Sequence, residues 1–215
     1  MSLHEGLARS EIELGAPTRR ALPYSSLKRF LDILVSMAAI LLCSPLLMLI
    51  AAAVRLDSPG PILFRQRRGG LGGAPFTILK FRTMTATEDG PEVIQAQKDD
   101  PRITRIGHRL RPFFLDELPQ LFNVLRGEMS LVGPRPHALV HDIYFGARIE
   151  GYSRRYTVKP GITGWAQIHG ARGQTPLDAD MQARTVLDLW YVEHANFVLD
   201  LLVLIRTPFE LFRRG

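Results

Sequence analysis

Residues 33–54 read ILVSMAAILLCSPLLMLIAAAV, a run of 22 residues without Asp, Glu, Lys or Arg. As a straight helix at about 1.5 Å per residue, this run would extend about 33 Å, which is enough to cross the hydrocarbon core of a bilayer. Ser44 and Pro45 stand in the middle of it. Because proline removes a backbone hydrogen bond and clashes with the preceding turn, the pattern predicts a kink or break at Ser44–Pro45.

Positive charge is balanced across this run. Four basic residues precede it and four follow it: Arg19, Arg20, Lys28 and Arg29, then Arg55, Arg65, Arg67 and Arg68. Basic residues beside a membrane segment are retained in the cytoplasm, so this balance favours a re-entrant hairpin with both ends on one side. Ser44 can satisfy part of the backbone that Pro45 frees, and a spanning helix with a proline kink is the alternative.

The composition is that of a globular chain with one membrane contact. The 215 residues are 46% hydrophobic and 22% charged, which excludes a disordered, collagen-like or coiled-coil chain. A mean hydropathy of +0.03 is too low for a polytopic membrane protein. Cys43 is the only cysteine, which excludes an intrachain disulfide and a multi-cysteine zinc site. The net charge of +6 favours anionic partners, whether nucleic acid, phosphorylated metabolites or acidic lipid.

The sequence predicts an α+β fold that is mostly helical. Residues 1–23 lack periodicity and are expected to form a loose N-terminal arm. The segments PILFRQRR (61–68) and PFTILKFRTM (75–84), joined by GGLGGA, predict a small β-hairpin. Residues 85–101 are predicted to be a loop, and helical patterns cover 104–125, 180–194 and 197–213.

The last helical pattern has two interpretations. It ends with apolar and then basic residues, Phe209, Leu211, Phe212, Arg213 and Arg214. It can lie in the membrane interface with its basic end against lipid phosphates, or it can be a core helix.

An acidic pair lies within RLRPFFLDELPQLFNVLRGEMSLVGPRP (109–136). Three-and-four spacing gives this segment one apolar stripe, formed by Leu110, Phe113, Phe114, Leu118, Leu121, Phe122 and Leu125. Asp116 is predicted on the opposite side and Glu117 near the edge of the stripe. Pro119 fits the first turn of a helix beginning near Asp116, which would place both carboxylates at its positive end. An ionised Asp is a nucleophile toward phosphorus, and a neighbouring Glu can hold Mg²⁺; an N-cap beside a solvated Glu is the simpler interpretation.

Basic residues near this pair strengthen the chemical interpretation. Lys80 and Arg82 are two apart on a predicted strand and should project from one face. Arg111 lies five residues before Asp116, and Arg135 is held between two prolines, which suits phosphate recognition. Two carboxylates with several cations match what phosphoryl transfer requires.

Two histidines nearby share the spacing of a metal site. His137 and His141 are four residues apart, but no third ligand accompanies them, so we expect surface histidines.

Five stretches resemble the bacterial sugar transferases, the monotopic phosphoglycosyl transferases that begin glycoconjugate assembly. They are KRFLDILVS (28–36) with the Ser44–Pro45 break, KFRTM (80–84), DDPRITRIGHRLRPFFLDELPQLFNVLRGEMSLVGPRPH (99–137), YTVKPGITGWAQIHGARG (156–173) and DLWYVEHANFVLDLLVLIRTPFE (188–210). The resemblance runs from about Lys28 to the C-terminus. It implies one domain over 24–215, with a re-entrant helix-break-helix at about 28–56 and a catalytic part at about 57–215 flanked by amphipathic interfacial helices.

The resemblance also implies a reaction. Asp116 would attack the sugar-linked phosphorus of a UDP-sugar, release UMP and pass the phosphosugar to undecaprenyl phosphate. Asp116 and Glu117 are the expected Mg²⁺ ligands, with Glu117 on the position associated with the metal. Lys80, Arg111, Arg135 and Asp188 fall on positions tied to the substrate or to the integrity of the site, and Ser44–Pro45 matches the helix-breaking pair.

Further expectations follow from the same resemblance. The motif stretches favour UDP-glucose or UDP-galactose as donor, in exopolysaccharide or other glycoconjugate synthesis. The protein is expected at the bacterial inner membrane with its catalytic part facing the cytoplasm, and with a homo-oligomer and downstream glycosyltransferases as candidate partners. Nucleic acid is not expected as a partner, because basic and aromatic residues are little interleaved and the basic residues cluster beside the apolar run. A membrane-associated scaffold that recruits assembly enzymes is the alternative function.

Overall fold

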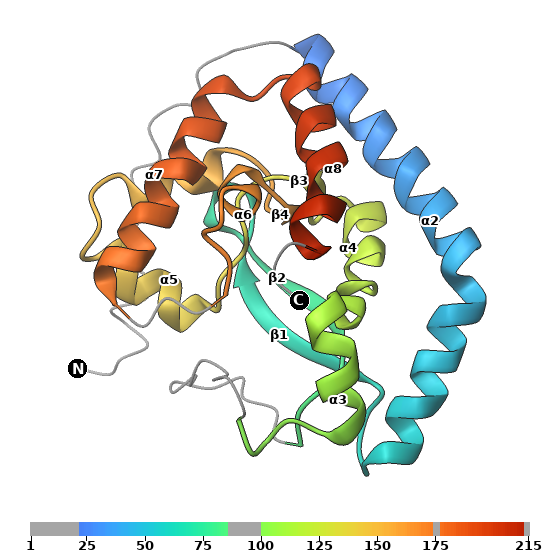
Figure 1. The fold of residues 1–215 in the computed structure, drawn as a ribbon. Helices are drawn as coiled ribbons and strands as arrows, with labels where there is room; N and C mark the ends of the chain where they lie inside the picture. The colour runs from blue at the N-terminus through green and yellow to red at the C-terminus, as the bar shows by residue number, and fades with distance from the viewer. Residues whose placement is uncertain (1–21, 86–99, 174–176, 213–215) are drawn as a thin grey trace.

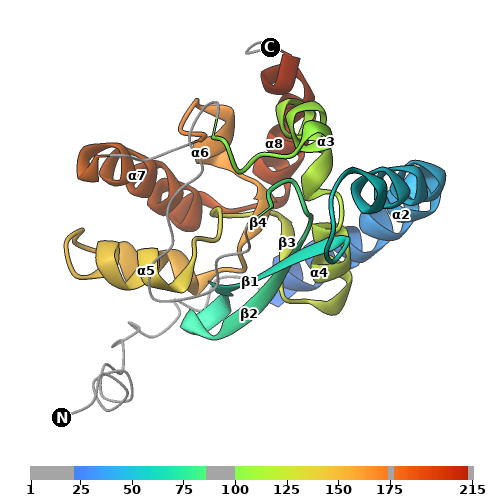
Figure 2. The ribbon, with the colours of Figure 1, turned by 90° about the horizontal axis from the view of Figure 1, so that it is seen from below.

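The computed structural model describes residues 22–85, 100–173 and 177–212. The expected N-terminal arm and most of the predicted 85–101 loop lie outside these residues. The described chain is mostly helical, as the sequence predicts. A long helix, α2 (Leu22–Asp57), runs along one side of the molecule, while α5 (Leu139–Gly146) and α7 (Asp178–His194) lie on the side away from it (Figures 1 and 2).

The apolar run forms the exposed middle of α2. Within Ser25–Asp57, the most apolar stretch of 18 residues has a mean hydropathy of 2.6, and 11% of that stretch is buried. By length and composition, the helix can cross a membrane. Leu42 is 83% exposed and Met48 is 74% exposed. A surface this apolar cannot be stable in water without a cover, which supports membrane association.

The predicted break at Ser44–Pro45 is not present as an interruption of the helix. α2 is continuous through Pro45 and follows a curved path (Figure 1). Ser44 Oγ donates a 2.8 Å hydrogen bond to the carbonyl of Leu41, one turn earlier. A proline within a continuous helix is accommodated by bending and by local side-chain hydrogen bonds of this kind, which is why the helix curves without ending.

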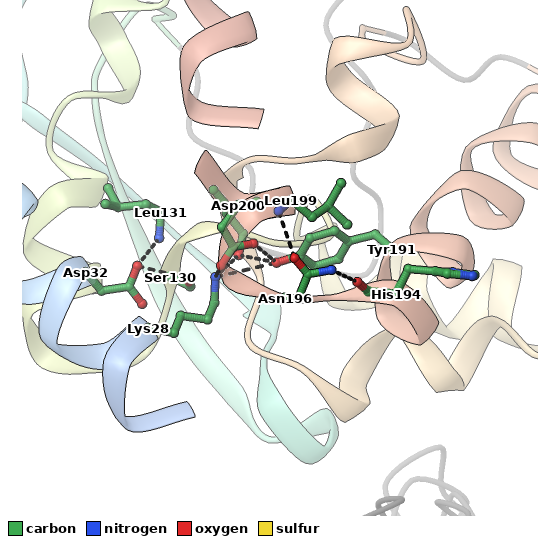
Figure 3. Close-up of polar contacts among 10 residues, drawn as sticks. Lys28, Asp32, Ser130, Leu131, Tyr191, His194, Asn196, Leu199 and Asp200 are labelled. Atoms are coloured by element: carbon green, nitrogen blue, oxygen red, sulfur yellow. Dashed lines mark hydrogen bonds and ion pairs between the residues drawn. The ribbon is translucent and has the colours of Figure 1, made fainter. Parts of the chain in front are cut away.

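Polar contacts fix the first turns of α2 to the rest of the fold (Figure 3). Lys28 Nζ lies 2.6 Å from Asp200 Oδ2 and donates a 3.0 Å hydrogen bond to the carbonyl of Val132. Asp32 Oδ1 accepts hydrogen bonds from Ser130 Oγ at 3.1 Å and from the Leu131 amide at 2.9 Å. Helix α2 is therefore attached directly to the strand β3 (Ser130–Val132).

The predicted β-hairpin is confirmed. β1 (Leu63–Gly69) pairs antiparallel with β2 (Pro75–Phe81), with Phe64 opposite Lys80 and Gly69 opposite Pro75. The turn between them contains a short 3₁₀ helix, η1 (Leu71–Gly73), with Gly72 at φ +65°. Glycine adopts this left-handed conformation without a steric penalty, which explains the glycine-rich junction.

The predicted helix over 104–125 is wrong as a single element. The structure has α3 (Arg105–Leu110), the 3₁₀ turns η2 (Arg111–Phe113) and η3 (Leu115–Glu117), and α4 (Gln120–Arg126). The helical path is interrupted at Phe114, which has φ +55° and lies between η2 and η3. The apolar stripe is divided accordingly: Leu110 and Leu121 are buried, while Phe113 is 63% exposed.

A second sheet, which the sequence did not predict, lies at the centre. β3 pairs in parallel with β4 (Gly161–Thr163). Around it packs a core of Ile78, Leu121, Val124, Met129, Leu131, Val132, Ile168, Tyr191, Leu199 and Val203. The short helices η4 (Tyr152–Thr157) and α6 (Trp165–Ile168) flank β4 in the chain, and α8 (Phe197–Phe212) runs beside the upper part of α2 (Figure 1).

Helix α8 combines features of both interpretations of the C-terminal pattern. Leu199 and Val203 are buried in the core, whereas Val198, Ile205 and Phe209 are 72%, 56% and 70% exposed. The helix therefore packs one face against the core and presents an apolar outer face next to α2.

Candidate active site

The acidic pair lies in η3, before α4. The sequence predicts both carboxylates at the start of a helix beginning near Asp116. This prediction is wrong, because Pro119 is the N-cap of α4 and both Asp116 and Glu117 precede that helix. Both side chains are buried, at 8% and 7% exposure, and Asp116 is not on a solvent-facing side. The left-handed conformation of Phe114 changes the direction of the acidic pair relative to a straight helix, which the helical pattern does not anticipate.

Two cations bind the Glu117 carboxylate. Lys80 Nζ lies 2.7 Å from Oε1, while Arg135 binds Oε1 through Nη2 and donates a 3.0 Å hydrogen bond to Oε2 through Nη1. Burial alone would raise the pKa of Glu117, but Arg135 and Lys80 hold it well below its usual range. Glu117 is therefore a fixed anion that orders both cations.

Asp116 has the opposite environment. Among the described residues, no side-chain hydrogen bond to its carboxylate is found. Burial raises the pKa of Asp116, although the positive charges of Lys80, Arg111 and Arg135 act against that rise. A carboxylate without hydrogen-bond partners, close to three cations, keeps its oxygens available for a reaction.

Lys80 and Arg111 reach this region from different elements. Lys80 comes from β2, where burial lowers the pKa of its ammonium group against the effect of Glu117. Arg111 begins η2, and its Nη1 donates a 3.3 Å hydrogen bond to Thr83 Oγ1. The strand β2, the turn η2 and the acidic pair on η3 are therefore close together, as the proposed catalytic role of these residues requires.

Asp188 does not contact the acidic pair directly. It lies on α7, where its Oδ2 is 2.9 Å from Arg155 Nε, and both side chains are 2% exposed. Arg155 Nη2 then donates a 2.7 Å hydrogen bond to the carbonyl of Arg135. Asp188 thus acts on Glu117 through Arg155 and Arg135. The sequence analysis did not single out Arg155, because nothing in its surroundings along the chain distinguishes it from the exposed Arg154.

Arg82 is not part of this cluster. The strand β2 ends at Phe81, so the predicted shared face with Lys80 is lost, and the Arg82 guanidinium binds the carbonyls of Val54, Ser58 and Pro59 at the end of α2. Only 2% of the residue is exposed. Its contacts are those of a helix C-terminal cap.

His137 is buried, contrary to the expectation of a surface histidine. It is 7% exposed, and its Nδ1 lies 2.7 Å from the hydroxyl of Tyr152, which donates a 2.8 Å hydrogen bond to Asp142. Burial, followed by the charges of Arg155 and Arg184, lowers the pKa of His137 well below its usual value. The imidazole is therefore neutral at pH 7. His141 is half-buried.

The acidic pair has capacity left for a divalent cation. Two carboxylates provide about eight acceptor positions, and the described contacts occupy three of those on Glu117 and none on Asp116. Mg²⁺ is commonly held by one or two carboxylates together with substrate phosphates and water. Among the described residues there is no group of three or more His, Cys, Asp or Glu that could hold a metal alone. The residues therefore fit a cation that a phosphorylated substrate helps to bind.

Comparison with known proteins gives a consistent result. Residues 23–214 match the family described as bacterial sugar transferase. A UDP-glucose:undecaprenyl-phosphate glucose-1-phosphate transferase of Caulobacter vibrioides is 54% identical over 180 residues, which cover 84% of this chain and 67% of the relative. The protein of that name from Escherichia coli is 48% identical over 186 residues, covering 86% of this chain and 40% of the relative.

A third relative has a similar length. The exopolysaccharide production protein PSS of Rhizobium leguminosarum is 43% identical over 193 residues, covering 88% of this chain and 96% of the relative. The chain thus spans about 40% of the E. coli relative and nearly all of the Rhizobium protein. Because the family match covers almost the whole chain, including the acidic pair and its cations, this protein belongs to the bacterial sugar transferase family.

Proposed function

We propose that this protein transfers a hexose-1-phosphate, with glucose-1-phosphate favoured, from a UDP-sugar to undecaprenyl phosphate and releases UMP. The single observation that supports this most is the buried Asp116 carboxylate beside Lys80, Arg111 and Arg135, which accepts no side-chain hydrogen bond from the described part of the chain. Nucleophile and phosphate-binding cations are the two components that a covalent phosphoryl transfer needs. The names of the Caulobacter and E. coli relatives support the donor and the lipid acceptor.

The first half-reaction uses Asp116 as the nucleophile. A carboxylate oxygen attacks the sugar-linked phosphorus, a phosphorus–oxygen bond to the aspartate forms, and the bond to the bridging oxygen of the diphosphate breaks. UMP leaves with that bridging oxygen and its electron pair. Lys80, Arg111 and Arg135 offset the charge on the phosphoryl oxygens, and Glu117 keeps Lys80 and Arg135 in place.

The second half-reaction regenerates the enzyme. A phosphate oxygen of undecaprenyl phosphate attacks the same phosphorus, and the bond to Asp116 breaks. The product is undecaprenyl diphosphate sugar, and the free carboxylate returns. Two steps avoid bringing three bulky anionic groups together at once.

Mg²⁺ is proposed at the acidic pair. Asp116 and the remaining acceptor position of Glu117 would hold it, together with diphosphate oxygens of the donor. When bound, the ion supplies charge neutralisation for the diphosphate.

We place the protein on the inner leaflet of the bacterial inner membrane. The apolar surface of α2 and the outer face of α8 support lipid contact. Both ends of α2 contact the same folded part, Lys28 through Asp200 and Val54 through Arg82, which supports a re-entrant arrangement. Cysteines introduced at Ala21 and Pro61, in a Cys43→Ser background, test this topology in intact spheroplasts. A re-entrant helix leaves both sites protected from impermeant thiol reagents, whereas labelling of one site alone identifies a spanning helix.

The function is tested by UMP release from a panel of UDP-sugars with undecaprenyl phosphate. We expect release with UDP-glucose and a covalent hexose phosphate on Asp116, detected by peptide mass after acid quenching in the absence of the acceptor. Folded, membrane-bound protein that releases no UMP with any sugar would support the scaffold alternative. Turnover with an adduct on another residue would overturn the role of Asp116.

A further inference from the structure

Arg184 is a buried cation without an ion-pair partner among the described residues. It lies on α7 and is 4% exposed. Its Nη2 donates a 2.9 Å hydrogen bond to the carbonyl of Gly173, and its Nη1 is 3.4 Å from Nε2 of His137. The Nε–H has no acceptor in the described part of the chain. A buried charge is ordinarily paired, so an arginine in this state is expected to have an anionic partner beyond the residues that the structure describes.

His137 orients this arginine. Nδ1 lies 2.7 Å from the hydroxyl of Tyr152, which donates to Asp142, and 3.2 Å from Arg155 Nη1, while Nε2 faces Arg184 Nη1 at 3.4 Å. These contacts hold the His137 ring in place between the Asp142–Tyr152 pair on one side and the Arg184 guanidinium on the other. Neutral histidine adds no charge to compensate the cation.

The location of Arg184 connects it with the candidate active site. Arg155 connects the two: its Nη1 lies 3.2 Å from Nδ1 of His137, whose Nε2 faces Arg184, and its Nη2 donates a 2.7 Å hydrogen bond to the carbonyl of Arg135. Arg135 in turn binds Glu117, next to Asp116. A row of cations therefore leads from Asp116 past Arg135 and Arg155 to Arg184, and no carboxylate of the described segments lies at ion-pair distance from Arg184.

We infer that Arg184 binds the phosphate of the leaving nucleoside monophosphate, while Arg135 lies closer to the phosphoryl group that is transferred. The inference rests on the proposed function, because the ligand must have one phosphorus at Asp116 and a second anionic group farther along the row. A nucleoside diphosphate sugar has this arrangement, whereas a polyprenyl phosphate carries a single phosphate at its end. Arg184 therefore discriminates between the two substrates.

Arg184→Met provides the test, with the full chain in lipid nanodiscs. Methionine keeps an unbranched side chain and removes the unpaired charge, so the variant is expected to unfold at the wild-type temperature or above it. We expect the inhibition constant of UMP and the KM for UDP-glucose each to rise at least tenfold, with the KM for undecaprenyl phosphate unchanged. Arg184→Lys keeps a charge but lacks the planar fork, and smaller rises of about threefold to tenfold are expected. Arg148→Met is the matched control, because Arg148 is exposed over the ring of Tyr144 and should leave all three constants unchanged.

The outcomes separate this inference from the proposed function. Equal losses for both substrates with unchanged UMP inhibition would indicate a structural role and overturn the inference. An active wild-type enzyme that UMP does not inhibit would overturn it as well. If Arg184→Met does not fold, the UMP inhibition constant of Arg184→Lys decides: a wild-type value rejects the inference. A wild-type protein that binds UMP but transfers no sugar phosphate would instead contradict the proposed function.

Discussion

The guanidinium of Arg155 donates a 2.7 Å hydrogen bond to the backbone carbonyl of Arg135, and its Nε is held 2.9 Å from Asp188. The position of Arg135 against Glu117 therefore depends on a buried ion pair between η4 and α7. Two neighbouring residues provide a comparison, since Arg154 and Glu193 join the same two elements at 2.7 Å but are 56% and 50% exposed.

Asp188→Asn is expected to destabilise the protein by about 3–5 kcal/mol, because it leaves the Arg155 charge buried and unpaired. Glu193→Gln removes the exposed counterpart and should cost about 1 kcal/mol or less. Chemical denaturation of the two variants measures the difference. Equal losses of unfolding free energy in the two variants would show that the buried Arg155–Asp188 pair stabilises the protein no more than the exposed Arg154–Glu193 pair.

The two adjacent carboxylates should respond to neutralisation with opposite signs. Glu117 has a pKa lowered by Arg135 and Lys80 despite burial, so its ionised form stabilises the folded state above a pH of about 4.5 and this contribution is lost as the pH falls through the lowered pKa. Glu117→Gln is therefore expected to cost about 3–5 kcal/mol at pH 7. Thermal unfolding at pH 7 checks this, and a variant as stable as the wild type would contradict the described contacts.

For Asp116 the sign is reversed. Burial raises its pKa, so ionisation disfavours the folded state above that pKa, and Asp116→Asn should be at least as stable as the wild type at pH 7. Because the nucleophile is removed, transfer should fall by at least about 10³-fold. A variant with wild-type activity would exclude a covalent intermediate on Asp116.

The pH dependence of the first half-reaction follows from the same shift. The attacking carboxylate must be ionised, and burial raises the pKa of Asp116 above its ordinary value of 3.8. The rate of UMP release should decline on the acid side with an apparent pKa above 3.8. Stopped assays across pH, in a range where the protein remains folded, measure it. A rate that is flat down to pH 4 would contradict this assignment.

Lys80 and Arg82 are expected to differ although they are two residues apart. Lys80→Met removes a cation beside Asp116 and should lower the transfer rate by about 10²-fold or more. Arg82→Met loses the hydrogen bonds that close the end of α2, which should cost about 1–3 kcal/mol of stability, while the KM for UDP-glucose stays near that of the wild type. Steady-state kinetics and unfolding of both variants distinguish the roles.

Local patterns in the sequence were sufficient for the elements that depend on near neighbours. The uncharged run at 33–54 has a length and composition that only a long apolar helix satisfies, and the glycine junction between two alternating segments specifies the β-hairpin. The acidic pair and the cations Lys80, Arg111 and Arg135 were also recognised as a group from the sequence, and the fold brings them together.

Tertiary structure alone decided the properties that depend on distant contacts. The left-handed residue Phe114 turns Asp116 and Glu117 inward, so burial and the two cations on Glu117 give adjacent carboxylates opposite pKa shifts. Sequence spacing cannot distinguish the role of Arg155 from that of Arg154, or the role of Arg82 from that of Lys80. These roles depend on the distant segment of the chain that packs against each side chain. Burial and charge pairing are determined by the whole fold, whereas hydrophobic periodicity and turn chemistry are determined by a few consecutive residues.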